Sequence, residues 1–83
     1  GDRLAELAKE VAHRPLSRKR RSRGEAVRAV QKRLKERGHA PGKIDGVMGK
    51  ITAYRVRRFQ RQMSYLKIDG RVGLRTWNAL FDA

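Results

Sequence analysis

Two stretches of one pattern, 24 positions apart, constrain this chain more than any other feature. Both follow IDGxxGxxT, over residues 44–52 and 68–76. In each copy, Asp-Gly favours a tight turn in which Gly adopts positive φ, and the second Gly stands where a helix N-cap is expected. The Thr then falls in the first turn of that helix. The repeat therefore predicts two equivalent loops that each lead into a helix.

Apolar side chains at helical spacing predict the helices around these loops. We expect one helix over residues 25–37, ending at Gly38 in the left-handed conformation, and a second over residues 50–63. A short third helix is expected over residues 76–81. The only β-like element expected is a short extended piece around residues 66–68.

The first 23 residues are expected to stand apart from the rest. Residues 2–12 carry one apolar stripe, with Asp2 as N-cap, which predicts a short amphipathic helix that must dock to persist. Residues 14–23 combine Pro15 with a dense run of cations, which favours a flexible linker. We place the domain boundary near Gly24, so that residues 1–23 are a helix and basic linker and residues 24–83 are the folded domain. The fold class is all-α, a small three-helix bundle with an N-terminal helical appendage.

Charge limits the kinds of partner. The chain has 22 Lys and Arg against 8 Asp and Glu, a net charge of +14, which favours an anionic partner such as nucleic acid, anionic lipid or a cell-wall polymer. There is no Cys, which excludes disulfides and thiolate metal sites. No apolar run approaches the roughly 18 residues of a membrane span, and the first residues lack a signal peptide.

Catalysis and metal binding find little support in the residue types. His13 and His39 lie outside any triad pattern, and zinc would need two further ligands. Asp45 and Asp69 are paired by the repeat, but each precedes a Gly in a turn, where capping explains it better than glycoside hydrolysis. The loops offer too few oxygen ligands for Ca²⁺. We therefore expect no catalytic residues, no metal and no cofactor.

Four elements in order resemble the three-helix peptidoglycan-binding domain that accompanies bacterial cell-wall hydrolases. They are Val27, Val30, Gln31, Leu34 and Gly38 in the first helix, the loop at residues 44–52, Val56, Phe59 and Gln60 in the second helix, and Asp69, Gly70, Gly73, Thr76 and Trp77. The resemblance runs from about Ala26 to Phe81. Lys50 and Leu74 depart from it, because the family commonly has Pro there, and so does the high Arg content of residues 50–63.

The resemblance implies a non-catalytic module that binds peptidoglycan or another anionic wall polymer. Its role would be to bring an attached or partner hydrolase, such as an amidase, muramidase or transglycosylase, to that polymer. It also implies a location in the cell envelope or outside the cell, in the periplasm or the extracellular space. We expect a monomer.

The resemblance further implies a groove near the Asp-Gly loops and the start of the second helix. The candidate ligand-binding residues are Asp45, Gly46, Gly49, Thr52, Tyr54, Arg55, Arg58, Asp69, Gly70, Thr76 and Trp77. Guanidinium groups suit the carboxylates of wall peptides, and aromatic rings suit sugars. Simpler interpretations stay open: turn and capping chemistry for the Asp and Gly residues, a core position for Trp77 and solvated surface charge for each Arg.

Nucleic-acid binding is the alternative function. Residues 14–23 and the Arg-rich helix over residues 50–63 could contact phosphates. A helix-turn-helix is disfavoured, because its turn has 3 to 4 residues whereas about 11 residues separate the first two helices of the domain. Residues 2–12 could also dock on a membrane surface or on a larger parent protein, although their apolar face is short.

Overall fold

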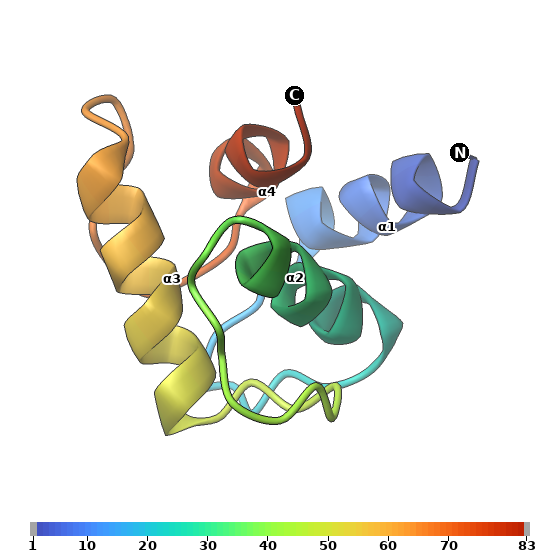
Figure 1. Cartoon of the computed structure of the whole chain (residues 1–83). Coiled ribbons are helices and arrows are strands. Elements are labelled where there is room, and N and C mark those ends of the chain that lie inside the picture. Colours follow the sequence, from blue (N-terminus) through green and yellow to red (C-terminus); the bar gives the residue numbers. More distant parts are fainter. Residues whose placement is uncertain (1, 83) are drawn as a thin grey trace.

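The computed structural model describes residues 2–82, which form four helices (Figure 1). The helices are α1 (Asp2–His13), α2 (Glu25–Glu36), α3 (Lys50–Gln62) and α4 (Leu74–Phe81). The described residues form no β-sheet, only two isolated bridges that pair Leu16 with Val72 and Arg23 with Val47. The all-α class is confirmed, and every helix end lies within two residues of its expected position.

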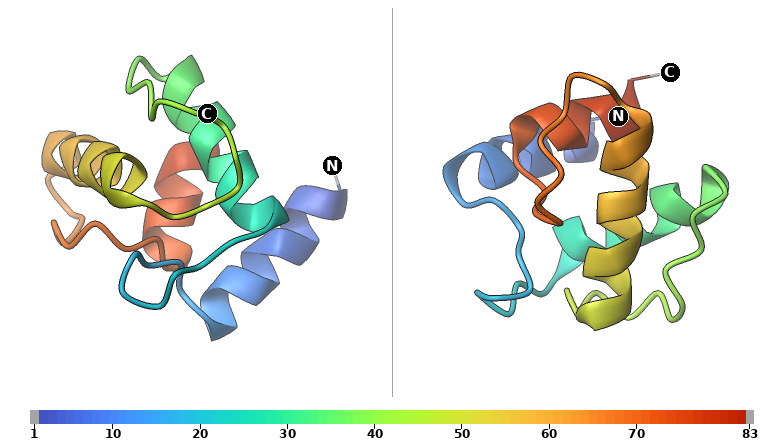
Figure 2. Two further views of the ribbon diagram at one scale, coloured as in Figure 1. Left: turned by 90° about the horizontal axis from the view of Figure 1, so that it is seen from below. Right: turned by 90° about the vertical axis from the view of Figure 1, so that its left-hand side faces the viewer.

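The core draws on all four helices. Helices α1, α2 and α4 pack against one another in pairs, and α3 packs against α2 (Figures 1 and 2). The largest fully buried side chains include Leu7, Leu34, Met48, Phe59 and Leu80. Met48 lies in the loop before α3, so a repeated loop contributes to the core directly.

Helix α1 is part of this core. Its Leu7 and Val11 are 2% and 1% exposed and belong to the same apolar cluster as the buried residues of α2 and α4. Arg3 donates two hydrogen bonds to the Glu25 carboxylate at the start of α2, at 2.9 Å and 2.5 Å, and lowers the pKa of that carboxyl. The expectation that this short helix must dock is confirmed. Asp2, expected to precede the helix as its cap, instead lies within its first turn.

The basic segment 14–23 follows one defined course along the two repeated loops. Leu16 exchanges backbone hydrogen bonds with Val72 in the second loop, at 2.9 Å and 2.8 Å. Ser22 accepts from the Met48 amide in the first loop at 2.9 Å, and Gly24 donates to the Gly46 carbonyl at 2.8 Å. The structure thus differs from the expected flexible linker, because backbone pairing holds the chain while the cationic side chains reach into solvent. Whether residues 24–83 fold alone stays a prediction.

Helix ends follow the expected chemistry at α2 and use arginines at α4. Gly38, directly after the C-cap of α2, has φ of +84°, as expected for a left-handed terminating glycine. At the end of α4 the Leu80 carbonyl accepts from Arg33 at 2.6 Å and from Arg37 at 3.1 Å. Cations near the last carbonyls of a helix also complement its dipole. Arg33 of α2 and Arg37, the C-cap residue of α2, therefore cap α4.

The prediction of a short extended piece around residues 66–68 is wrong. Leu66 lies in a turn directly after α3, where its amide donates to the Met63 carbonyl at 3.0 Å. Leu66 is buried whereas Ile68 is 47% exposed. Instead, the β-like pairing lies at Val72, which forms an isolated antiparallel bridge with Leu16.

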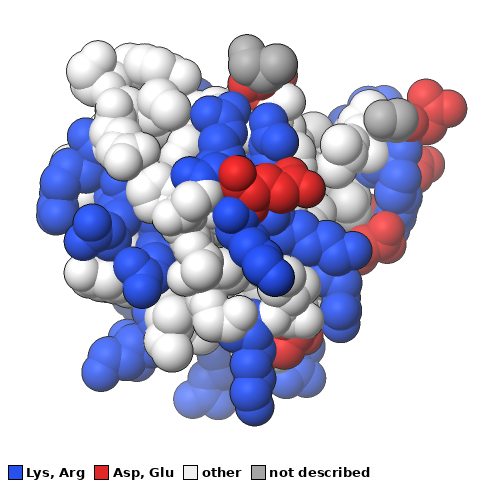
Figure 3. Space-filling model, in the orientation of Figure 1, with Lys and Arg blue, Asp and Glu red and all other residues white. Residues whose placement is uncertain are grey.

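Cations dominate the face of the molecule in Figure 3, with acidic side chains in smaller groups. Helix α3 alone has five Lys or Arg and no acidic residue. None of the helices in residues 2–82 combines the length and the apolar character needed to cross a membrane.

Replacing Leu7 by Ala tests whether α1 belongs to the core. We expect a loss of about 2 to 4 kcal/mol in the free energy of unfolding, because the change leaves a cavity among buried side chains. Leu4→Ala in the same helix is the control, since Leu4 is 37% exposed, and it should cost less than about 1 kcal/mol. Urea denaturation followed by circular dichroism measures both. Equal effects of the two substitutions would contradict a core role for α1.

Candidate functional site

The first repeated loop is organised around the buried carboxamide of Gln31 in α2. The two N–H bonds of its Nε2 are shared among three acceptors, Asp45 Oδ1 at 3.1 Å, the Val47 carbonyl at 3.1 Å and Thr52 Oγ1 at 3.0 Å. Its Oε1 accepts from the Gly46 amide at 2.8 Å. Gln31 is 0% exposed, so these partners replace water entirely. One side chain thereby connects α2, the Asp-Gly turn and the first turn of α3.

The second loop repeats this arrangement around Gln60 in α3. The two N–H bonds of Gln60 Nε2 are shared among Asp69 Oδ1 at 3.0 Å, the Arg71 carbonyl at 2.9 Å and Thr76 Oγ1 at 3.2 Å. Its Oε1 accepts from the amides of Asp69 at 3.0 Å and Gly70 at 2.9 Å. Gln60 is 1% exposed. The two loops are therefore equivalent in three dimensions as well as in sequence.

Both aspartates also stabilise their own turns through hydrogen bonds to backbone amides. Asp45 Oδ1 accepts from the Val47 amide at 3.0 Å, and Asp69 Oδ1 accepts from the Arg71 amide at 2.9 Å. These are the bonds of an Asx-turn, in which the side chain holds the backbone two residues on. At Asp45 the Val47 amide and the Gln31 carboxamide lower the pKa of the carboxyl. Both candidate aspartates therefore contact the protein's own loops.

The glycines of the repeat meet close neighbours. Gly46 and Gly70 have φ of +74° and +72°, where other residues are strained. A Cβ on Gly46 would lie 3.1 Å from the Gly24 carbonyl oxygen, and one on Gly70 would lie 2.8 Å from the Arg57 guanidinium. Gly49, like Gly73, is the N-cap of the following helix in an extended conformation, as expected.

Three further candidate residues lie in the interior. Thr52 and Thr76 are 4% and 6% exposed, each with its hydroxyl on a glutamine, and Trp77 is 2% exposed. The Trp77 ring lies 4.4 Å from that of Phe81, between centroids. Trp77 is therefore a core residue, and these three side chains shape the loops from within.

The remaining candidates share one outward face of α3. Tyr54 is 46% exposed, and the guanidinium carbons of Arg55 and Arg58 lie 5.4 Å and 6.0 Å from its ring centroid. Arg58 also donates to the Tyr54 hydroxyl at 3.4 Å, and this contact, with the nearby positive charges, lowers the pKa of the phenol. Ile51, one turn earlier, is 58% exposed. We call Ile51, Tyr54, Arg55 and Arg58 the α3 face; it combines an aromatic ring and an aliphatic side chain with two cations.

Sequence reasoning did not place Gln31 and Gln60 in the site, although both hold its loops. A shared pattern was the available signal: each Gln directly follows an apolar residue and comes four residues after a Val. Gln31 follows Val27 in this way, and Gln60 follows Val56. Across residues 2–82 no group of three or more His, Asp or Glu side chains is placed to hold a metal ion.

Comparison with known proteins assigns the class. The family model of the peptidoglycan binding domain matches residues 23–80, and the chain belongs to this family. The solved structure of the SleB N-terminal domain superposes with a TM-score of 0.76 and 36% identity, covering 83% of this chain and 90% of that one. Fold and family agree, so this chain is a peptidoglycan-binding domain of the SleB type.

Two curated relatives are longer enzymes. The chain is 44% identical over 57 residues to the spore cortex-lytic enzyme of Bacillus subtilis (strain 168), covering 69% of this chain and 19% of the enzyme. It is 42% identical over 60 residues to the spore cortex-lytic enzyme of Bacillus cereus (strain ATCC 14579), covering 72% of this chain and 23% of the enzyme. The chain therefore spans about a fifth of the length of these relatives.

Gln60→Leu tests the glutamine that holds the second loop. We expect the free energy of unfolding to fall by about 3 kcal/mol, because the Thr76 hydroxyl and the loop amides lose their buried partner. Arg61→Leu, at an exposed position in the same helix, should cost less than about 1 kcal/mol. Chemical denaturation measures both variants. If Gln60→Leu is as stable as Arg61→Leu, the carboxamide does not hold the loop.

Stability should depend on the charge of Asp45. Because the folded loop lowers the pKa of this carboxyl, the unfolded chain binds its proton more tightly, and protonation favours unfolding. The stabilisation is complete above the ordinary aspartate pKa of about 3.9 and is lost as pH falls through the lower folded pKa.

Asp45→Asn retains a hydrogen-bond acceptor but cannot titrate. The fall of the thermal midpoint between about pH 5 and pH 2 should therefore be shallower in this variant than in the wild type. Asp82→Asn removes the same charge at an exposed position and is the control. Parallel melting curves for Asp45→Asn and the wild type across this pH range would count against the assignment.

Proposed function

We propose that this chain is a non-catalytic module that concentrates an attached or partner wall-active enzyme on peptidoglycan. Membership of the family over residues 23–80 supports the binding role. The similar region makes up about a fifth of the spore cortex-lytic enzymes, so most of each of those proteins lies outside it. By this proposal the module acts at the cell envelope, in the periplasm or outside the cell.

The α3 face is the proposed ligand contact, and its geometry is the observation on which the proposal depends. A binder of peptidoglycan needs a flat apolar surface for sugar and cations for peptide carboxylates. Tyr54 and Ile51 supply the first, and Arg55 and Arg58 supply the second, all within two turns of one rigid helix. Because the helix fixes the backbone of these four positions, binding has to order only their side chains.

The loop residues take an indirect part in this proposal. Asp45, Gly46, Thr52, Asp69, Gly70 and Thr76 form the two glutamine-centred networks. Gly49 caps α3, and Trp77 lies in the core. These residues set where α3 begins and how it sits on the domain. The engagement of both carboxylates with glutamine and backbone supports a structural role for them over acid–base catalysis.

Tethering supplies the mechanism. A module bound to an insoluble polymer holds its attached enzyme at a high effective concentration near the bonds to be cut, without changing the chemistry of cleavage. The benefit depends on the enzyme being linked to the module or bound by it. A shallow face of modest affinity suits this purpose, because the enzyme must move along the polymer between events.

Nucleic-acid binding is a second candidate, favoured by one observation. Segment 14–23 carries six cations and no acidic residue, and parts of it line one hollow with Arg57 and Arg71. Phosphate contacts of this kind give binding that falls steeply with salt. The dependence of binding on salt therefore distinguishes the two functions.

Retention on purified, nucleic-acid-free peptidoglycan sacculi tests the proposal. We expect the chain to stay bound at about 0.3 M salt, where long-range electrostatics are screened to well under 10 Å, and to resist competition by duplex DNA. Tyr54→Ala and Arg58→Ala should each weaken binding about tenfold, because each removes one direct contact.

Lys32→Ala is the matched control. It removes one exposed charge from α2, away from the α3 face, and should leave retention nearly unchanged. Release of the wild type by DNA, in step with salt, would favour the nucleic-acid candidate. Full retention of both Tyr54→Ala and Arg58→Ala would show that the α3 face is not the contact.

A further inference from the structure

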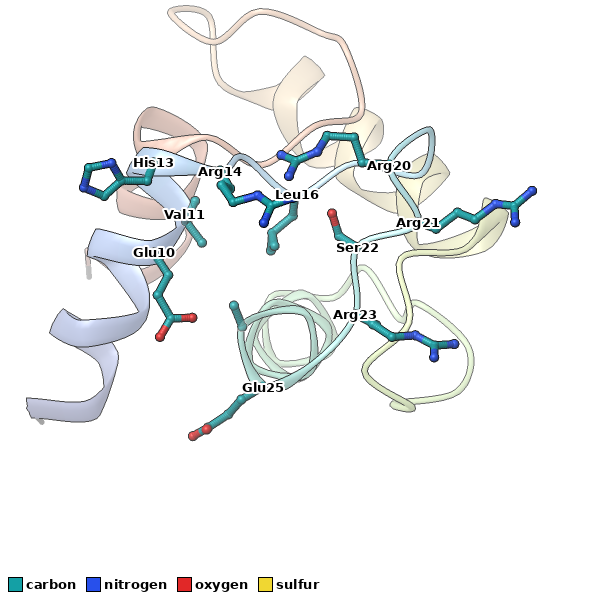
Figure 4. A pocket seen from close by; sticks show the side chains of 11 residues that line it. Glu10, Val11, His13, Arg14, Leu16, Arg20, Arg21, Ser22, Arg23 and Glu25 are labelled. Atoms are coloured by element: carbon teal, nitrogen blue, oxygen red, sulfur yellow. The ribbon is translucent and has the colours of Figure 1, made fainter.

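A second hollow lies on the other side of the segment 14–23, between α1 and the start of α2 (Figure 4). Its volume is about 570 Å³, and most of its lining residues precede the stretch matched by the family model. The apolar side chains that line it are Val11, Leu16 and Ala26, which are 1%, 8% and 8% exposed. We call it the N-terminal pocket. Its apolar lining is rigid, because these residues belong to the core.

Two arginines share one rim of the N-terminal pocket. Figure 4 shows the side chains of Arg14 and Arg20 on the same side, near Leu16. Arg20 donates to the Pro15 carbonyl at 3.0 Å, which fixes its direction. Neither arginine forms an ion pair with a carboxylate of residues 2–82. Two like charges at one rim repel each other, and a carboxylate bound between them would relieve that repulsion through charge-assisted hydrogen bonds.

Two carboxylates lie on another side of the same pocket. Glu10 reaches out from α1 and Glu25 from α2, apart from the arginine rim (Figure 4). Glu25 is already held by Arg3, at 2.9 Å and 2.5 Å. Glu10 forms no ion pair within the described part of the chain, so its carboxylate can accept from a ligand. The pocket therefore presents cations on one side and an anion on another.

The wall formed by the segment 14–23 is organised before any ligand arrives. Ser22 Oγ accepts from the Ser17 amide at 3.0 Å, and Ser17 Oγ accepts from the Arg20 amide at 3.1 Å. Backbone bonds from Leu16 to Val72 and from Met48 to Ser22 attach both ends of the segment to the repeated loops. A ligand that fits this wall avoids the cost of ordering it.

We propose that the N-terminal pocket binds a zwitterionic segment of the peptidoglycan peptide, one with a free carboxylate and a free amine. Arg14 and Arg20 take the carboxylate, Glu10 takes the ammonium group, and the aliphatic part lies over Val11 and Leu16. This proposal rests on the proposed function, since it names the part of the polymer held at a site separate from the α3 face. Arg21 and Arg23 also line the pocket, but in Figure 4 their side chains point away from Leu16. Glu10 would repel a phosphate and attract the ammonium group of a zwitterion, so the side of the pocket that carries Glu10 suits the peptide better than nucleic acid.

Binding of a synthetic tripeptide, N-propionyl-L-alanyl-γ-D-glutamyl-L-lysine, whose only free amine is that of the lysine side chain, to the full chain tests the proposal by isothermal titration calorimetry. We expect Arg14→Ala to weaken binding about tenfold through loss of a charge-assisted contact. Glu10→Gln should weaken binding of this tripeptide by a similar factor. The same tripeptide acetylated on the lysine amine should bind the wild type about tenfold more weakly and be insensitive to Glu10→Gln.

Lys19→Ala is the control, since it removes an exposed cation of the same segment that does not line this pocket. Absence of tripeptide binding, equal binding of the acetylated tripeptide, or equal effects of Arg14→Ala and Lys19→Ala would each overturn the proposal. Binding of a DNA duplex that Arg14→Ala weakens, without tripeptide binding, would overturn it in favour of phosphate recognition. Sacculus retention, measured in parallel, separates the two failures: a chain that binds sacculi through the α3 face but not the tripeptide loses only this proposal.

Discussion

The buried carboxamide of a glutamine is the interaction on which the rest of this structure depends. A loop rich in glycine has few apolar side chains with which to hold itself, and its amides and carbonyls need partners when buried. Gln31 and Gln60 each supply two N–H donors and a carbonyl acceptor, whereas a carboxylate has no donor and a hydroxyl has only one. Each loop is thereby fixed to the helix before it and the helix after it.

Much of the fold could be predicted from the sequence because its signals are local. Positive φ at Gly46 and Gly70 and the ends of α2 and α3 follow from turn chemistry and helical periodicity. The course of residues 14–23 could not be predicted, because backbone pairing of Leu16 with Val72 leaves no signature in side chains. A run of cations does not prevent an ordered backbone, and here backbone bonds to the repeated loops hold the segment while its Lys and Arg side chains stay exposed to solvent.

The candidate site residues also divide into those with local sequence signals and those whose role depends on contacts between distant parts of the chain. Spacing and resemblance drew attention to the repeated Asp, Gly and Thr residues, and the structure places their polar groups on Gln31, Gln60 and nearby backbone. Tyr54, Arg55 and Arg58 lie outside this network, with Tyr54 half exposed to solvent. A sequence pattern cannot by itself separate residues that shape a surface from residues that form it. Burial separates them, and burial depends on contacts between distant parts of the chain.

Helix α3 takes part in both networks, with Thr52 near its start and Gln60 near its end. Each residue added to or removed from a helix rotates everything beyond it by about 100° and shifts it by about 1.5 Å. A one-residue insertion between these two positions would turn one of them out of the interior and detach its loop. The helix thus serves as a spacer of fixed length and phase between the two loops.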